Sequence, residues 1–333
     1  MKEQRGPLTI GWIPYLNLLP FRMEAERAFP ADVVWKAAHP TDVNRLLAAG
    51  EVAMAPSSSV CLIKCPHNEM VAPVGVVSDA EVMSVYLGFD HSETVLLELI
   101  QQRLAVASEI IRYAIRSHPD QMRMAAQSAW KDLVDLAPIA TVAPLLKIST
   151  ASATSASLAK FIYRICFGEN ASFTRVVTAQ ESHHFENELP VISLLIGDEA
   201  LEQRSKFASI LDLGAVWKHL TGLPFVYAVW QTAHPQSVLR YEDTLTAIAE
   251  RAQTRMRVEP GHYLQRVELH DAHHLRTTLP DYWAGLRYRL TPNDMNGLLL
   301  FLALVRPLLK IETSDEVSAK LLRWQQRAQQ LQF

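Results

Sequence analysis

Over residues 9–60, short apolar runs alternate with an amphipathic segment, a pattern typical of βαβ units. The predicted strands are Thr9–Tyr15, Val33–Lys36 and Val52–Pro56, and the predicted helix covers residues 41–49. Thr41 is the expected N-cap of this helix, and Gly50 occupies the position that ends it. The first part of the chain is therefore expected to form an α/β sheet.

The pattern continues toward the carboxyl end. Further strands are predicted at residues 83–89, 145–150, 191–196 and 223–230. A helical region from Glu93 to about Leu136 breaks at His118-Pro119-Asp120, and a helix through Phe167 ends at Gly168. From Ser237 onward the chain is mostly helical, with capping signals at Thr291-Pro292 and Thr313-x-x-Glu316.

This order of elements predicts two α/β lobes that share strands, with a ligand cleft between them. The first lobe is expected to comprise residues 1–90 and 222–333, and the second residues 91–221. A helical insertion at about 91–145 belongs to the second lobe in this interpretation. Plain packing is its simplest role; covering the cleft or forming a homodimer interface are the alternatives.

Composition excludes several classes of protein. The chain is 49% hydrophobic and 20% charged, with a net charge of −3 and no basic run, so we expect no nucleic-acid or membrane partner. The longest apolar run, Leu298–Val305, is far below the roughly 20 residues that span a bilayer. The first residues lack the apolar core of a signal peptide, and three cysteines argue against a disulfide framework. These features predict a cytoplasmic protein.

Small polar residues follow several of the predicted strands, where open α/β sheets bind ligands. They are Asn17, Ser57–Ser59, Ser152–Ser155 and Gly197-Asp198. The residues alone favour a local role for each of them: a turn cap for Asn17, and N-caps for Ser152–Ser155 and Asp198. Helix starts that carry free amides also bind anions, so the Ser152–Ser155 segment can serve both purposes.

The other candidates for chemistry are weaker. Cys61-x-x-x-Cys65 has no second cysteine pair, and Cys166 lies in an apolar helix, so these thiols are expected in the core. A metal site is more plausible at Glu268, His270, Asp271, His273 and His274 than at His183-His184, yet it lies in a polar helical tail. Trp217 and Trp230 are expected to be packing residues, with Phe225 as an alternative ligand-facing aromatic. These patterns lead us to expect no metal. No glycine-rich phosphate loop or dinucleotide fingerprint is present, so we expect no nucleotide cofactor either.

A set of motifs in one order resembles the menaquinone-pathway enzymes of periplasmic-binding-protein type II fold, most closely chorismate dehydratase of the futalosine route. The motifs are Gly11-x-Ile-x-Tyr-Leu-Asn-x-Leu-Pro-Phe21, Gly50-Glu-Val-x-x-Ala-Pro-x-Ser-Ser59, Ser78-Asp79 with Ser84-Val-x-Leu87, Ser152–Ser155, Leu194–Leu201, Asp212-Leu-Gly-x-x-Trp217 with Thr221–Trp230, and Tyr288-x-Leu-x-x-x-Asp294-x-x-Gly-Leu298. The resemblance covers nearly the whole chain except about residues 91–145. The Tyr-Leu-Asn-x-Leu-Pro signature favours the dehydratase over its sister, dihydroxynaphthoate synthase.

The resemblance implies a cofactor-independent lyase that removes water from chorismate to give 3-[(1-carboxyvinyl)oxy]benzoate. It places Asn17 and Ser84 on reactive parts of the substrate as catalytic residues. The substrate-binding residues that it implies are Tyr15, Ser58, Ser59, Ser152, Ala153, Thr154, Ser155, Gly197 and Asp198. The family more often has isoleucine where Ser57 stands, so Ser58 and Ser59 carry more weight than Ser57.

The proton acceptor is the open point of this reaction. Asp198 would need a raised pKa to act as a general base, and the sequence gives no sign of one. A carboxylate of the substrate itself is the acceptor that we hypothesise. Two alternatives to the dehydratase stay open: an enzyme of the sister type acting on a related aromatic acid, and a non-catalytic protein that binds a small acid.

Overall fold

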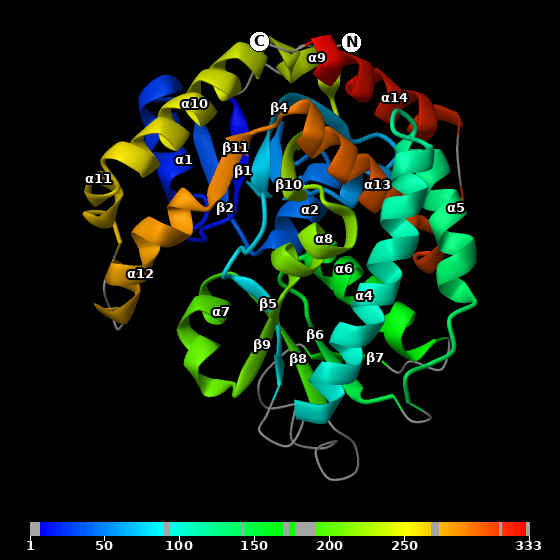
Figure 1. Ribbon diagram of the computed structural model, residues 1–333. Coiled ribbons are helices and arrows are strands. Elements are labelled where there is room, and N and C mark those ends of the chain that lie inside the picture. Colours follow the sequence, from blue (N-terminus) through cyan, green and yellow to red (C-terminus); the bar gives the residue numbers. More distant parts are fainter. Residues whose placement is uncertain are drawn as a thin grey trace. The chain divides into compact units, whose positions relative to one another are not determined.

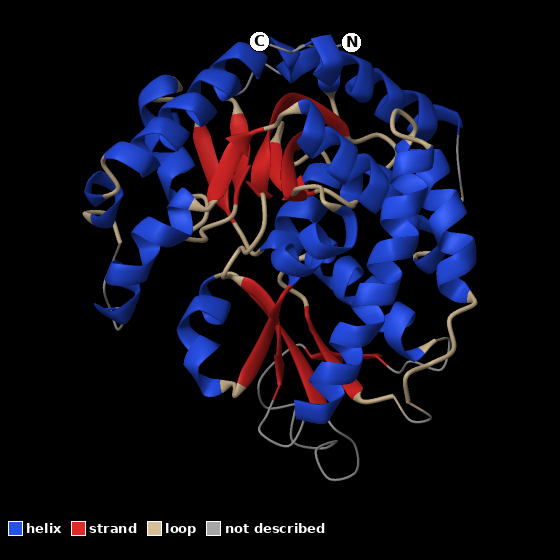
Figure 2. Cartoon of the chain, in the orientation of Figure 1, coloured by secondary structure: helices blue, strands red, loops and turns tan. Residues whose placement is uncertain are grey.

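The computed structural model describes residues 7–89, 94–140, 143–168, 173–176, 191–267, 273–312 and 315–330. The chain divides into two units, each made of two separate segments. Unit one comprises Met1–Val77 and Tyr227–Thr291, and unit two comprises Ser78–Val226 and Pro292–Phe333. Each unit contains a sheet flanked by helices (Figures 1 and 2).

Unit one is built on two groups of strands. Strand β1 (Thr9–Trp12) pairs in parallel with β2 (Val34–Ala37), and the N–H of Gly11 donates to the carbonyl of Met54 at 2.9 Å. That last bond joins β1 to the segment that enters β3 (Ala55–Ser58). A four-stranded sheet has the order β11 (Leu286–Arg289), β4 (Glu69–Ser78), β10 (Phe225–Thr232), β3. The helices of this unit are α1 (Leu19–Ala28), α2 (Pro40–Ala48), α3 (Cys61–Lys64), α9 (Pro235–Val238), η4 (Leu239–Tyr241), α10 (Glu242–Val258), α11 (Gly261–Leu264) and α12 (His273–Ala284).

Unit two is built on a five-stranded sheet. Its order is β7 (Phe173–Val176), β6 (Leu145–Ser149), β8 (Val191–Ile196), β5 (Val85–Phe89), β9 (Ser209–Asp212). Strands β6 and β8 are parallel, and β5 is antiparallel to both of its neighbours. The helices are α4 (Thr94–Ser117), α5 (Met122–Val134), α6 (Ala153–Phe167), α7 (Asp198–Gln203), η3 (Arg204–Lys206), α8 (Leu213–Thr221), α13 (Pro292–Leu308) and α14 (Asp315–Gln330).

The observed boundaries of the units differ from the predicted lobes, 1–90 with 222–333 and 91–221. Strand β5 pairs with β8 and β9, which brings residues 78–90 into unit two. Helix α13 packs on α5 and α6, so the carboxyl-terminal helices also belong to unit two. The predicted insertion forms α4 and α5, which pack on each other and on α8, α6 and α13. Within unit two these helices contribute to the packed interior.

In unit one, the expected cap of α2 was wrong and one strand was missed. Thr41 is not the N-cap of α2, because the helix begins at Pro40 and His39 is its N-cap. Proline suits a first helical position, since the N–H that it lacks has no partner there. Strand β4 had no counterpart among the expected elements, although it is buried along almost its whole length.

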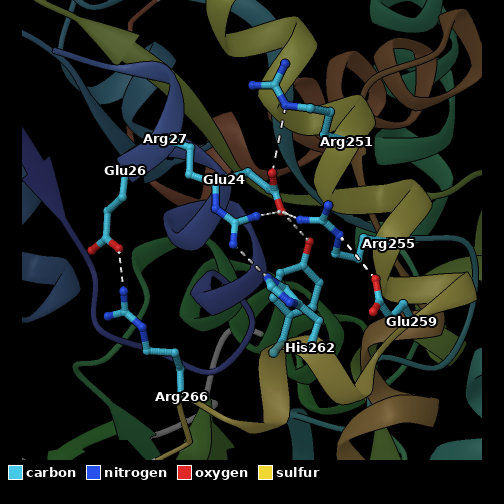
Figure 3. Close-up of polar contacts among 9 residues, drawn as sticks. Glu24, Glu26, Arg27, Arg251, Arg255, Glu259, His262 and Arg266 are labelled. Atoms are coloured by element: carbon cyan, nitrogen blue, oxygen red, sulfur yellow. Dashed lines mark hydrogen bonds and ion pairs between the residues drawn. The ribbon is translucent and has the colours of Figure 1, made fainter.

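Helix α1 is tied to α10 and α11 by a buried carboxylate. Glu24 is 2% exposed and forms ion pairs with Arg27 at 3.5 Å, with Arg251 at 3.8 Å and with Arg255 (Figure 3). The hydroxyl of Tyr263 donates to the same carboxylate at 3.2 Å. A buried charge requires such partners, because its transfer from water costs several kcal/mol, about what a close ion pair recovers.

Aromatic side chains fill the interior of each unit. In unit two the ring of Trp217 lies 5.4 Å from Phe225 and 5.8 Å from Phe301. In unit one Trp230 lies 5.2 Å from Phe21. The expectation that Trp217 and Trp230 are packing residues is confirmed, and Phe225, which is 1% exposed, belongs to the same core. Among the described residues, no helix is both long and apolar enough to cross a membrane.

Candidate functional site

The Tyr15-Leu16-Asn17 segment forms the turn between β1 and α1 in unit one. The N–H of Leu18 donates to the carbonyl of Tyr15 at 3.0 Å, and the carbonyl of Asn17 accepts from the hydroxyl of Tyr288 at 2.6 Å. The side-chain oxygen Oδ1 of Asn17 is buried and has no hydrogen-bond partner among the described residues. A buried acceptor without a partner costs about 1–3 kcal/mol, which a ligand donor would recover.

Ser58 and Ser59 lie at the end of β3, and a side chain from α2 orients the first of them. Oδ1 of Asn44 accepts from the hydroxyl of Ser57 at 2.8 Å and from the N–H of Ser58 at 3.2 Å. Its Nδ2 donates to Oγ of Ser58 at 3.3 Å. Because Ser58 accepts from Asn44, it keeps its own O–H as a donor. Gln231 adds rigidity by donating to the carbonyls of Ser57 and Ser58.

The Asn17 turn and the Ser58-Ser59 pair lie beyond the same edge of unit one. Strand β1 forms a parallel bridge with the segment that leads into β3, at Ile10 and Met54. The carboxyl ends of parallel strands meet at one edge of a sheet, where open α/β sheets bind ligands. The structure therefore brings these predicted residues of unit one into one region.

The strand register of the five-stranded sheet brings the predicted residues of unit two together at one edge. Val85, the first residue of β5, pairs with Ile196, the last residue of β8. The N–H of Gly197 donates to the carbonyl of Ser84 at 2.7 Å. Strand β6 runs parallel to β8, so residues 152–155 follow it at the same edge. Ser84, Ser152–Ser155 and Gly197-Asp198 thus share one edge of the five-stranded sheet.

Helix α6 begins at this edge with a serine cap, as the sequence predicts. Oγ of Ser152 accepts from the N–H of Ser155 at 3.2 Å. The hydroxyl of Ser155 is buried, with the residue 1% exposed, and it has no hydrogen-bond partner among the described residues. The positive end of a long helix beside a buried hydroxyl is an arrangement that suits an anion.

Asp198 does not cap α7, contrary to expectation. Gly197 is the N-cap, with φ of 72° and ψ of −142°, and Asp198 is the first helical residue. This left-handed φ favours glycine, because a Cβ there is strained. Asp198 lies in the first turn, where a carboxylate complements the helix dipole.

Asp212 is a residue of the site that sequence reasoning missed. Its carboxylate caps α8 by accepting from the N–H of Ala215 at 3.0 Å. It also accepts from the N–H of Val82 at 3.1 Å and from that of Met83 at 2.8 Å. Met83 has a φ of 65°, so the backbone just before Ser84 is strained, and Asp212 holds it. The cap is foreseeable from Asp-Leu-Gly, but the contact with Val82 and Met83 has no local signal.

Asp212→Ala is expected to lower the free energy of unfolding by about 2 kcal/mol, because buried N–H groups lose their acceptor. Burial raises the pKa of Asp212, and the three N–H bonds lower it in part. The folded carboxyl binds its proton more tightly than the unfolded one, so the part of the stability that comes from this pKa shift is fully present below pH 3.8, the unfolded value, and is lost as pH rises through the folded pKa. The hydrogen bonds to the three N–H groups remain at neutral pH. Urea unfolding of the wild type and of Asp212→Ala should show a larger difference in the free energy of unfolding at acid pH than at neutral pH. A constant difference from neutral to acid pH would contradict the raised pKa.

The three cysteines are free thiols, of which Cys61 and Cys166 are buried and Cys65 is partly buried. Burial raises the pKa of Cys166 to about 12, so its reactive thiolate is scarce at neutral pH. The hydrogen bond between Cys61 and the Cys65 thiol, followed by burial, raises the pKa of the Cys61 thiol. No cluster of His, Cys, Asp or Glu able to hold a metal occurs in the part of the chain that is described. His183-His184 and residues 268–272 lie outside that part, as do the side chains of His273 and His274.

The predicted site residues of unit one and those of unit two have similar chemistry. Apart from the carboxylate of Asp198, they offer neutral amide and hydroxyl donors, one buried amide acceptor and the positive end of a helix. Such groups bind carboxylates and hydroxyls of a small acid and stabilise charge that develops on them.

Comparison with protein families gives one match over most of the chain. The model of a family described as "Menaquinone biosynthesis" matches residues 8–111 and 120–307. The matched ranges include most of residues 91–145, the predicted helical insertion. A search of curated proteins finds no match.

Solved structures with a similar fold include proteins of the periplasmic-binding-protein fold. The aliphatic sulphonate binding protein SsuA from Escherichia coli has a TM-score of 0.59 and 7% identity over 95% of this chain and 97% of its own. The alkanesulfonate-binding protein from Xanthomonas axonopodis pv. citri, bound to MOPS, has a TM-score of 0.58 and 9% identity over 96% and 99%. A Candida albicans protein of the generic periplasmic-binding-protein fold has a TM-score of 0.54 and 10% identity, over 95% of this chain and 94% of its own. At these identities the likeness shows the fold alone, and it confirms the predicted two-lobe α/β fold.

Proposed function

The chain belongs to the menaquinone biosynthesis family, and we propose that it acts there as a chorismate dehydratase. The observation that carries this proposal is the buried Oδ1 of Asn17, an acceptor without a partner among the described residues. It belongs to the Tyr-Leu-Asn-x-Leu-Pro signature that resembles the dehydratase. Chorismate carries a ring hydroxyl, a donor of the kind that this acceptor lacks.

The proposed reaction needs little beyond orientation and electrostatic stabilisation. The C–H bond at the ether-bearing carbon breaks, and the ring carboxylate delocalises the electron pair through the conjugated ring. The neighbouring C–O bond then breaks, the hydroxyl takes up the proton that the C–H bond released and leaves as water, and the ring becomes aromatic. The protein must align these bonds and stabilise charge on the carboxylate and the departing oxygen.

Each group of residues has a part in the proposal. In unit one, Asn17 contacts the leaving hydroxyl, while Tyr15, Ser58 and Ser59 bind the substrate. In unit two, Ser84 donates to developing negative charge or to the leaving hydroxyl. The N-terminus of α6 accepts a carboxylate of the substrate, and the buried hydroxyl of Ser155 supports this role.

We propose that the proton passes to a carboxylate of the substrate rather than to Asp198. Asp198→Asn is therefore expected to keep the rate of chorismate dehydration within about threefold of wild type, an effect below 1 kcal/mol. Steady-state kinetics on chorismate measure this. A loss comparable with that of Asn17→Ala would identify Asp198 as the base instead.

A binding protein without catalysis is the second candidate, and the solved structures of similar fold favour it. A third candidate is an enzyme of the sister type that acts on a related aromatic acid. The three differ in what happens to chorismate. A dehydratase converts it, a binding protein returns it unchanged, and a sister-type enzyme neither converts it nor is stabilised by it.

The deciding experiment is incubation of the purified, metal-free protein with chorismate, followed by mass spectrometry. Appearance of 3-[(1-carboxyvinyl)oxy]benzoate together with equal loss of chorismate supports the proposal. Thermal stabilisation by chorismate without product overturns it in favour of the binding protein. If chorismate neither forms product nor stabilises the protein, the proposal is overturned in favour of another acid as substrate.

A further inference from the structure

Two aromatic side chains hold the turn that carries Asn17. Trp283 of α12 donates its indole N–H to the carbonyl of Leu16 at 2.8 Å. Tyr288 of β11 donates its hydroxyl to the carbonyl of Asn17 at 2.6 Å. Both residues are 0% exposed. Two consecutive carbonyls of the turn are thus fixed by side chains from a distant part of the sequence.

The hydroxyl of Tyr288 occupies the place of a helical hydrogen bond. If α1 began one residue earlier, the N–H of Phe21 would donate to the carbonyl of Asn17. Instead, both groups hydrogen-bond to the Tyr288 hydroxyl. The N-cap residue Leu18 provides no side-chain cap. Tyr288 therefore caps α1 while keeping Asn17 outside the helix.

The chemistry of Tyr288 suits a permanent donor. Burial raises its pKa well above the usual value of 10.0, the charges of nearby tyrosines add to this, and the N–H of Phe21 lowers it in part. The hydroxyl stays protonated at any pH used for assays, so it always donates. The ring of Tyr288 also packs edge to face on Phe21 at 5.6 Å. A phenylalanine in its place would keep that packing and remove the hydroxyl alone.

We infer that Tyr288 is a positioning residue for Asn17: its hydroxyl fixes the Asn17 peptide and thereby the direction in which the side-chain amide is presented. Trp283 performs the same task one residue earlier. This role rests on the proposed function, in which Asn17 contacts the reacting part of chorismate. It extends that function to a residue that touches no substrate.

Tyr288→Phe is the test, with Tyr263→Phe as the matched control. Tyr263 is also 0% exposed and belongs to the same unit, and its hydroxyl donates to Glu24 in the middle of α1. Each variant deletes one buried hydroxyl and keeps the ring. Tyr288→Phe is expected to lower kcat for chorismate by at least about 10-fold, since small displacements of a reacting group cost that much. KM should change less, and Tyr263→Phe should lose Tm to a similar extent but keep kcat.

The outcomes separate this inference from the proposed function. A wild-type protein that does not convert chorismate overturns the proposed function and this role with it. A converting wild type whose Tyr288→Phe variant keeps its kcat, or loses no more than Tyr263→Phe, overturns the positioning role alone. If Tyr288→Phe does not fold, Trp283→Phe takes its place in the same comparison. That variant deletes the donor to Leu16 and keeps an aromatic ring.

Discussion

Replacing Asn17 by alanine is expected to lower kcat/KM for chorismate by about 10²–10³-fold, the usual cost of losing one oriented polar group that acts on the transition state. The substitution removes a buried acceptor that has no partner among the described residues. The free protein therefore loses no side-chain hydrogen bond at that oxygen and no longer bears the cost of burying it, so Tm is expected to equal or exceed that of wild type. Activity and stability separate in this variant because the missing partner belongs to the substrate.

Initial rates of product formation and thermal melts of the same preparations check this. Ser84→Ala should lose activity to a similar degree if the two residues act on the same reaction. Asn293→Ala is the matched control, because it removes an exposed amide in the first turn of α13. An Asn17→Ala protein with wild-type kcat/KM would show that Asn17 only shapes the turn, which is the interpretation that the residues alone favoured.

Much of the secondary structure was predictable because its signals are local. Strand β8 covers the predicted residues 191–196, and the helices α4 and α5 break where His118-Pro119-Asp120 predicts. Gly168 ends α6 with a φ of 71°, a conformation that favours glycine. In each case one short stretch of sequence contains all the information.

Strand β4 was missed because its sequence contains residues that disfavour central strands. Pro73 lacks an N–H for the ladder, yet its carbonyl accepts from the N–H of Leu290 at 2.8 Å. Gly75 is required by close approach of a neighbouring strand: a Cβ there would lie 2.2 Å from the carbonyl oxygen of Ala228. Tertiary packing overrides local preference in this strand.

The candidate site shows the same division between local and distant information. The motifs predicted which segments carry polar residues at strand ends, and the serine cap of α6 is confirmed. The contacts that hold these segments join residues far apart in sequence, as between Asp212 and Met83 or between Tyr288 and Asn17. No local pattern links the two partners of such a pair, so sequence patterns alone cannot find the contact between them.

Glu24→Gln is expected to lower the free energy of unfolding by about 3 kcal/mol, the lower end of the cost of breaking a buried ion pair. The neutral amide cannot compensate Arg27, Arg251 and Arg255, which all approach the Glu24 carboxylate. The lower end applies because the side chains of Arg27 and Arg251 are about half exposed, at 54% and 49%, and can turn toward water. Arg255 is only 32% exposed, so its charge is the one that water compensates least when the carboxylate is lost. Urea unfolding monitored by tryptophan fluorescence measures the change.

Glu26→Gln on the same helix is the matched control. Glu26 pairs with Arg22 at 3.2 Å and with Arg266 at 2.8 Å, but its side chain is 31% exposed. Solvent screening limits such pairs to about 0–1 kcal/mol, so this variant should unfold close to wild type. Burial rather than the number of ion pairs would then explain the difference between two glutamates two residues apart. Equal losses in both variants would contradict that explanation.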